Sequence, residues 1–224
     1  MRTGKDMWVV ALVPVKLNSQ RVPHKNVRDL GGHPLLWHVC NTLARAEGID
    51  EVCVYCSSEE VERYLPDGAT FVQRPEWLDA DEVKGAQIYG EFMSQVDADA
   101  YVLAHTTSPF LSRESVERGV EAIRSGEHDS AFTAQRVQTF CWFRGEPLNY
   151  DLADVPRTQD MEPVWVETSG FYMFRRELFL EEGRRIGHDP LIVEVSPIEA
   201  VDIDEPQDFE LAEAIAASRT KGVD

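Results

Sequence analysis

Basic and small polar side chains crowd a short segment near the start of the chain, directly after the continuously apolar residues 8–14. They are Lys16, Asn18, Ser19, Arg21, Lys25 and Asn26. No acidic residue lies between Lys16 and Arg28, so charge-assisted hydrogen bonds from this segment could neutralise a polyphosphate. The glycine spacing is neither that of a P-loop nor that of G-x-G-x-x-G. A solvated loop with ordinary surface cations is the alternative interpretation.

Two aspartates stand two residues apart near the end of the chain, within residues 200–208. On an extended segment alternate side chains share one face, so the carboxylates of Asp202 and Asp204 would point the same way. Mg²⁺ binds through one or two carboxylates together with substrate phosphates, which makes this pair a candidate metal site. The alternative is that Asp204 caps a helix that has Glu205 and Pro206 in its first turn. Capping would leave Asp202 unexplained.

Other polar residues of the second half could bind a small polar molecule. They are Arg157, Gln159, Asp160 and Tyr172. A turn held by a surface salt bridge accounts for the first three equally well. His105 directly follows the apolar residues 100–104 and could hydrogen-bond a ligand, act as a base or serve only a structural role.

Alternating strands and helices would position these residues. The expected strands of the first half are residues 8–14, 51–56, 70–73 and 100–104, and the expected helices are residues 34–48, 82–96 and 112–125. This alternation predicts right-handed β-α-β crossovers and a largely parallel sheet. Ligands of such sheets bind at the carboxyl ends of the strands, where the cationic segment and His105 would lie.

The second half changes character. Its expected strands are residues 129–135, 165–174 and 191–203, and its expected helices are residues 176–186 and 204–218. Residues 137–164 lack helical periodicity and contain three prolines, so they are expected to form an inserted arm or small β-lobe. We therefore expect a single α/β domain over residues 1–224 with one insertion.

Composition narrows the function. The 224 residues carry 22 Lys+Arg and 40 Asp+Glu, a net charge of −18, which argues against a partner with a phosphate backbone such as nucleic acid. No apolar run approaches the length of a membrane span, and residues 8–15 are too short for the core of a signal peptide. A cytoplasmic location with no membrane partner is the expectation.

The four cysteines include a C-x-x-C pair, Cys53 and Cys56. The pair lies within the expected strand 51–56 rather than at the start of a helix, and no second pair stands at zinc-ligand spacing. Buried thiols are therefore favoured over metal or redox chemistry.

Five motifs resemble one family in order along nearly the whole chain. They are residues 14–26, Gly31-Gly-His-Pro-Leu35, Thr107-Ser-Pro109, Arg157-Thr-Gln-Asp160 and Asp202-Ile-Asp-Glu-Pro-Gln-Asp-Phe209. The family is that of the cytidylyltransferases that make CMP-activated sugar acids, the CMP-N-acylneuraminate and CMP-KDO synthetases. The resemblance implies a three-layer Rossmann-like nucleotidyltransferase fold, with a mostly parallel sheet and an inserted dimerisation arm. It implies a Mg²⁺-dependent enzyme that joins CMP from CTP to a small acidic acceptor, such as an acylneuraminate, and releases pyrophosphate.

The same resemblance implies a role for each candidate residue. The catalytic contacts to the triphosphate would come from Lys16, Arg21 and Lys25; the nucleotide would be bound by Leu12, Pro14, Asn18, Ser19, Asn26, Arg74 and His105; the acceptor by Arg157, Gln159, Asp160 and Tyr172; and Mg²⁺ by Asp202 and Asp204. The chain departs from the family where His105 replaces glutamine and where Thr168-Ser-Gly170 replaces Asn-Gly-Ala. In addition, Thr107 occupies the place of a second metal aspartate of the KDO branch.

Three alternatives stay open. The acceptor could be a KDO-type acid or a phosphonate, the base could differ from cytosine, or the protein could be a nucleotide-binding regulator without catalysis. Members of the family are dimers whose arm crosses to the neighbour, so the resemblance also implies a homodimer.

Overall fold

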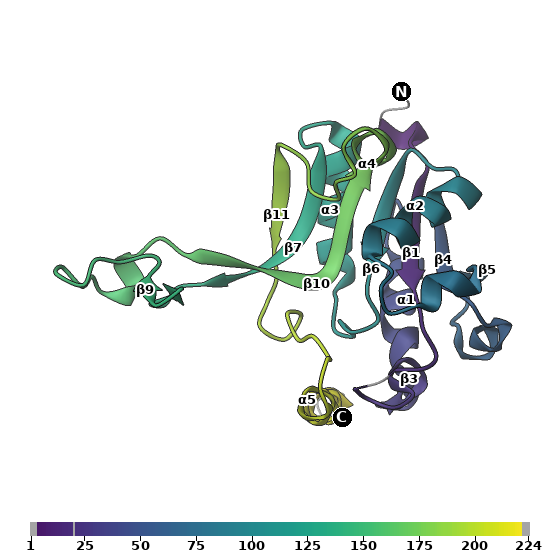
Figure 1. Cartoon of the computed structure of the whole chain (residues 1–224), viewed down its shortest axis with the longest axis horizontal. Coiled ribbons are helices and arrows are strands. Elements are labelled where there is room, and N and C mark those ends of the chain that lie inside the picture. Colours follow the sequence, from purple (N-terminus) through teal and green to yellow (C-terminus); the bar gives the residue numbers. More distant parts are fainter. Residues whose placement is uncertain (1–3, 20, 221–224) are drawn as a thin grey trace.

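A seven-stranded sheet forms the centre of the protein, for which the computed structural model describes residues 4–19 and 21–220. Gln20, in the middle of the cationic segment, lies outside the described residues. The strands are β1 (Val9–Pro14), β4 (Glu51–Cys56), β5 (Ala69–Gln73), β6 (Ala100–Ala104), β7 (Ser130–Val137), β10 (Val164–Arg175) and β11 (Pro190–Glu194). Their order across the sheet is β11-β7-β10-β6-β1-β4-β5 (Figure 1).

Strand β10 alone in this sheet runs against its neighbours. It pairs antiparallel with β6 and β7, whereas β1, β4, β5 and β6 are mutually parallel and β11 is parallel to β7. The expectation of a mostly parallel α/β sheet is therefore confirmed. Because β1, β4 and β6 are parallel, the loops that follow them meet at one edge of the sheet.

Two helices cover each face of the sheet. On one face α1 (Leu35–Arg45) and α3 (Arg113–Ser125) pack against the odd-numbered side chains of β1, and on the other face α2 (Gly85–Gln95) and α4 (Arg176–Glu182) pack against its even-numbered ones. Strand β1 is apolar throughout because both of its faces are covered. The expected bounds of α1, α2 and α3 are close, whereas α4 ends at Glu182 instead of residue 186, because Gly183 adopts a left-handed conformation. Ser112 caps α3 as expected and accepts a hydrogen bond from the Ser115 N–H at 3.1 Å.

The same alternation separates the C-x-x-C pair. The thiol of Cys53 packs into the core cluster beneath α2, and that of Cys56 lies in the cluster on the α1 side. Burial raises the pKa of Cys53 to about 12, and the three cysteines of the body are free and buried. The interpretation of buried thiols is thus confirmed.

The expected strand over residues 191–203 is too long. Strand β11 ends at Glu194, and residues 195–205 form turns and extended backbone. Pro197 interrupts the run because proline cannot donate to a strand ladder. Glu199, on the turn that follows, accepts hydrogen bonds from the Ser112 N–H and the Ser115 hydroxyl, both at 2.9 Å.

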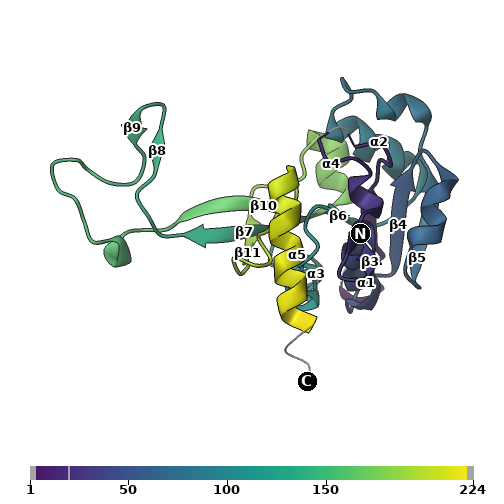
Figure 2. The same cartoon turned by 90° about the horizontal axis from the view of Figure 1, so that it is seen from below.

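A last helix, α5 (Pro206–Thr220), closes the edge of the sheet toward which β1 runs (Figures 1 and 2). It packs through a small separate core that contains Ile203, Phe209, Leu30 and Phe110. The short strands β2 (Asp29–Leu30) and β3 (His33–Pro34) form the adjoining hairpin.

The segment between β7 and β10 projects far from the body as an arm (Figures 1 and 2). We define the arm as residues 138–163; it contains a hairpin of β8 (Trp142–Phe143) and β9 (Glu146–Pro147). Its shape agrees with the expected insertion. Among the described residues, no helix combines the length and apolarity that crossing a bilayer requires.

Candidate active site

The loop after β1 is fixed in place by one buried amide. The side chain of Asn26 donates to the Lys16 carbonyl at 2.7 Å and accepts from the Thr106 hydroxyl at 2.6 Å. Asn26 therefore joins two ends of its own loop and ties that loop to the one after β6. The oxygen and the nitrogen of its amide each already have a partner. Contact of Asn26 with a nucleotide stays a prediction.

The cationic loop meets the acidic segment that precedes α5. Arg21 lies 2.9 Å from Asp204, and Lys25 lies 3.6 Å from the same carboxylate. Lys25 also donates to the Ile203 carbonyl at 2.7 Å, and Arg21 lies 3.1 Å from Glu205. The two segments, which are remote in sequence, thus face each other. Carboxylates beside Arg21 raise its pKa through hydrogen bonding and charge.

A hollow of about 310 Å³ opens beside these contacts. Its lining consists of Lys16, Asn18, Ser19, Arg21, Val22 and Lys25. Three cations around one hollow can bind a polyphosphate through charge-assisted hydrogen bonds. Here the structure brings together five of the residues predicted from the sequence.

Asp202 presents an oxygen that has no partner within the described part of the chain. Its Oδ2 accepts from the Ser169 hydroxyl at 2.7 Å, whereas its Oδ1 is buried and makes no hydrogen bond there. Ile203, buried between the two aspartates, donates its N–H to the Thr107 carbonyl at 2.9 Å. The burial of Ile203 agrees with alternation along this segment, and a common face for the carboxylates of Asp202 and Asp204 stays a prediction.

Another aspartate holds the start of α5. The carboxylate of Asp208 accepts from the N–H groups of Asp204 and Glu205, at 3.0 and 2.7 Å. The Asp204 carboxylate meanwhile contacts Arg21 and Lys25. The capping alternative for the Asp204 side chain is therefore not what the structure has.

Lys16 and Arg74 lie on the opposite flank, near the 3₁₀ helix Glu76–Asp79. Lys16 donates to the Asp79 carbonyl and lies 3.5 Å from Asp81. Arg74 is buried, pairs with the Asp79 carboxylate and donates to the Tyr55 carbonyl at 3.4 Å. This guanidinium thus organises the flank of the site from within, and its contact with a base stays a prediction.

His105 stands between the acidic segment and β10. Its Nδ1 lies 3.0 Å from the Ser169 carbonyl, and since a carbonyl only accepts, Nδ1 carries the proton and Nε2 keeps a lone pair. Burial lowers the pKa of His105, so the ring is neutral near pH 7. Its edge faces the ring of Tyr172, with 6.4 Å between the ring centroids.

The peptide that holds Ser169 is a bulge in β10. Pairing with β7 shifts between Glu167 and Tyr172, and the Thr133 hydroxyl oxygen accepts hydrogen bonds from the Thr168 hydroxyl and the Phe171 N–H, at 2.8 and 3.1 Å. The bulge re-aims the backbone so that Ser169 reaches Asp202.

The other residues predicted to bind the nucleotide differ in how far their side chains are exposed. Leu12 is buried within β1 and packs into the core beneath α2, so its side chain cannot reach a ligand at the surface. Pro14 is half-buried at the end of β1, directly before the loop. Asn18 is exposed and Ser19 half-buried.

Three residues predicted to bind the acceptor lie on the arm. Arg157 contacts Asp160 at 2.7 Å across the 3₁₀ turn Thr158–Asp160, which also holds Gln159. The arm leads away from α5 and the loops around the hollow (Figure 1). Within one chain, the structure does not bring these residues together with Asp202 and Asp204. Only Tyr172, of the four, lies beside the site.

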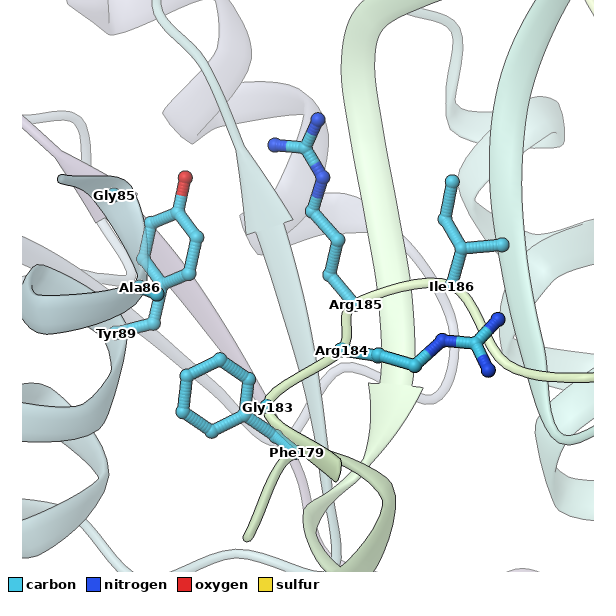
Figure 3. Close-up of a pocket in the computed structure, with 8 residues that line it drawn as sticks. All are labelled: Gly85, Ala86, Tyr89, Phe179, Gly183, Arg184, Arg185 and Ile186. Carbon is cyan, nitrogen blue, oxygen red and sulfur yellow. The ribbon is translucent and has the colours of Figure 1, made fainter. Parts of the chain in front are cut away.

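The sequence analysis missed a second, larger pocket of about 510 Å³ between α2 and the segment that follows α4 (Figure 3). Its lining consists of Gly85, Ala86, Tyr89, Phe179, Gly183, Arg184, Arg185 and Ile186. The Arg185 guanidinium lies 3.7 Å from the centre of the Tyr172 ring. Two adjacent arginines after a helix-ending glycine, in so acidic a chain, indicate a cationic segment, although not the pocket that this segment helps to form.

The loops after β1 and β6 and the segment before α5 thus converge around a cation-lined hollow, an arrangement typical of the ligand sites of parallel α/β sheets. Residues 10–222 match the family model described as "Cytidylyltransferase". Because this match covers nearly the whole chain, the protein belongs to the cytidylyltransferase family.

Individual relatives agree with this assignment. The chain is 29% identical over 219 residues to N-acylneuraminate cytidylyltransferase A of Danio rerio, covering 93% of this chain and 51% of the relative. It is 24% identical to the CMP-N,N'-diacetyllegionaminic acid synthase of Legionella pneumophila, covering 93% of this chain and 96% of the relative. The chain spans about half the length of several curated relatives it matches, including two fish N-acylneuraminate cytidylyltransferases.

The fold has close counterparts among solved structures. A structure of CMP:2-keto-3-deoxy-manno-octonic acid synthetase complexed with CTP superposes with a TM-score of 0.72 at 19% identity, covering 95% of this chain and 99% of that one. The expected Rossmann-like nucleotidyltransferase fold is thereby confirmed.

Proposed function

We propose that this protein transfers a cytidylyl group from CTP to a nonulosonic acid such as an acylneuraminate, giving a CMP-conjugate and pyrophosphate. Family membership supports the cytidylyl donor, and the names of the relatives support the acceptor class. The observation that carries the proposal is the convergence of Arg21 and Lys25 with Asp204 beside one hollow.

In the proposed reaction an acceptor hydroxyl oxygen bonds to the α-phosphorus and its proton passes to water. The bond between the α-phosphorus and the bridging oxygen breaks, and pyrophosphate leaves with that electron pair. Catalysis then comes from positioning and from neutralising the charge on the phosphoryl oxygens. Lys16, Arg21 and Lys25 would bind the triphosphate. Each now contacts an acidic side chain or a carbonyl oxygen, so nucleotide binding would exchange one set of anionic partners for another.

Asp202 and Asp204 would hold a Mg²⁺ ion. The buried, unpartnered Oδ1 of Asp202 fits this role, because hard cations are bound by carboxylate oxygens. The described residues contain no group of three or more His, Cys, Asp or Glu that could hold a metal by itself. Two carboxylates with phosphate oxygens form the usual ligand set for Mg²⁺. When bound, the ion would polarise the α-phosphate.

The arm supports a homodimer. Large apolar side chains are exposed along it and at its base, including Trp142, Phe143, Leu152 and Val155, each more than half exposed. Such a surface is expected to be covered by a partner. In a dimer, the arm would carry Arg157, Gln159 and Asp160 toward the acceptor side of the neighbouring site.

The direct test is to incubate the protein with CTP, Mg²⁺ and a panel of sugar acids and to follow pyrophosphate release. We expect release with at least one nonulosonic acid, and little release when UTP or ATP replaces CTP. KDO and a phosphonate in the same panel test the other acceptors. CTP binding without pyrophosphate release for any acceptor would replace the proposal with a nucleotide-binding regulator.

A further inference from the structure

The pocket between α2 and α4 holds one cation that is directed into it. Figure 3 shows the Arg185 guanidinium and the Tyr89 hydroxyl extending toward the same space above Phe179, whereas Arg184 extends the other way. Burial raises the pKa of the Tyr89 hydroxyl, against the opposing effect of the nearby Arg185. The pocket thus combines an aromatic wall with a hydroxyl and a guanidinium.

The two adjacent arginines have different partners. Arg184 lies 3.3 Å from Glu182 and donates to the Gly187 carbonyl at 2.9 Å. Arg185 stacks on Tyr172 and lies 3.9 Å from Glu167, whose carboxylate also accepts the Tyr172 hydroxyl at 2.9 Å. Arg184 therefore serves its own loop, and the long ion pair leaves Arg185 with donors to offer.

Hydrogen bonds to Asp129 and Ser130 hold the loop that carries Arg185. The Asp129 carboxylate accepts from the N–H groups of His188 and Asp189, at 2.6 and 3.1 Å, and the Ser130 hydroxyl oxygen accepts from the Gly187 N–H at 2.7 Å. A Cβ on Gly187 would overlap the Asp129 carboxylate, so the backbone packs directly on it. This bracing presents Arg185 in a fixed place, which lowers the entropic cost of binding a ligand.

The pocket adjoins the proposed reaction site. Arg185 contacts Tyr172, Tyr172 faces His105, and His105 is bonded to the same Ser169 whose hydroxyl reaches Asp202. A molecule extending from the aspartate pair would reach the pocket across Tyr172 and His105.

We propose that Arg185 binds the carboxylate of the acceptor acid, an inference that rests on the proposed function. An acidic acceptor entering a chain of net charge −18 needs a local cation. Lys16, Arg21 and Lys25 line the other hollow and are paired with Asp81 or Asp204. Arg185 is placed on the acceptor side, and its planar guanidinium can donate two parallel hydrogen bonds to a carboxylate.

The experiment compares R185Q, R185K and, as the control, R113Q in the 224-residue chain; R113Q alters a pair of the exposed Arg113 with Glu117 on α3, on the other face of the sheet. The probes are the panel acid that releases most pyrophosphate and its methyl ester, with CTP saturating. We expect R185Q to raise KM for the acid about 10- to 100-fold, as for the loss of hydrogen bonds to a charged group. KM for the ester and KM for CTP should change less than about threefold, R185K should recover part of the loss, and R113Q should behave as the parent.

Equal rises in KM for acid and ester, or the same effect from R113Q, would overturn the assignment. Thermal melting verifies that each variant is folded. Calorimetric titration of N-acetylneuraminate into the parent and R185Q proteins, with CMP present, gives a readout independent of turnover. A parent that binds this acid through Arg185 yet releases no pyrophosphate would contradict the proposed function alone. Equal affinity of both proteins for the acid would contradict the role of Arg185.

Discussion

Two regions of the molecule, the arm and the edge of the sheet that carries the site, differ in whether their side chains have partners within the chain. At the edge, buried polar groups such as Asn26 and Thr106 are paired with each other, and cations face acidic side chains. On the arm, aromatic residues such as Trp142 and Phe143 are more than half exposed, and the arm projects from the body (Figure 2). Among the described residues, most polar groups of the edge have partners within one chain, with the buried Oδ1 of Asp202 as an exception, whereas the apolar surface of the arm is left uncovered.

This contrast predicts that mutations in the two regions have different effects. A change at the edge alters charge or hydrogen bonding that the chain already makes, so it should affect turnover or stability without a partner. A change on the arm alters a surface that one chain leaves uncovered, so it should affect assembly first. The predictions below test this separation.

The largest effect is expected from D204N. Losing one negative charge beside Arg21 and Lys25 should lower kcat on the order of 100-fold or more, because charge stabilisation dominates phosphoryl transfer. The melting temperature should stay within a few degrees of the parent. Pyrophosphate release and thermal melting measure the two outcomes, and E213Q, which alters a surface pair of Glu213 with Arg28, is the control. Full activity at saturating Mg²⁺ would remove the metal role, and an unfolded variant would favour a structural one.

A double change of W142S and F143S should weaken the homodimer proposed above. Both side chains are exposed on the arm, and loss of such aromatic anchors should weaken association by roughly 30-fold or more. Analytical ultracentrifugation over a concentration series measures this, and L211S, at an exposed leucine of α5, is the control. A parent protein that is monomeric at all concentrations would contradict the assembly proposed for the arm.

T106V should weaken the edge without changing its charge. The variant leaves the buried Asn26 oxygen without its donor, which should cost about 1–3 kcal/mol of unfolding free energy. Urea denaturation measures the loss, and S94A on the exposed face of α2 is the control. An unchanged midpoint would show that the two loops are held together by other contacts.

The smallest effect is a pH dependence from Asp129. Burial alone would raise the pKa of its carboxyl group, but hydrogen bonds from the backbone of His188 and Asp189 outweigh burial and lower it. Its contribution to stability is therefore present above the ordinary aspartate pKa of about 4 and is lost as the pH falls below that value. Urea denaturation of the parent and D129N at about pH 7 and about pH 3 should show a difference that shrinks in acid. A difference that is equal at both pH values would contradict this account, and D189N is the control.

Local patterns were enough to predict most of the fold. The strands 51–56 and 100–104 have the predicted bounds, because short apolar runs bounded by polar residues determine buried strands. The strand 191–203 was predicted too long because Pro197 was not weighted as a breaker. The antiparallel direction of β10 could not be derived, since direction depends on the long excursion of the arm.

The candidate site was predictable where one segment supplies several groups. The hollow lined by Lys16, Arg21 and Lys25 comes from one loop, and Asp204, two residues after Asp202, meets Arg21 and Lys25 beside it. The pocket around Arg185 was not predictable, because Tyr89 and Arg185 meet only after α2 and the segment following α4 pack on the same face of the sheet. Arg157 is the opposite case: its motif was recognised in the sequence as part of the acceptor site, but the residue lies on the projecting arm, away from that site.

The bulge divides β10 into two halves with different structural roles. Its inner half places Ser169 and Tyr172, and its outer half, paired with β7 from Val164 onward, forms the root of the arm. The Thr133 hydroxyl holds the bulge that lies between these two halves. A displacement of the arm would be carried along the paired residues 164–167 to the bulge, where Ser169 contacts both Asp202 and His105.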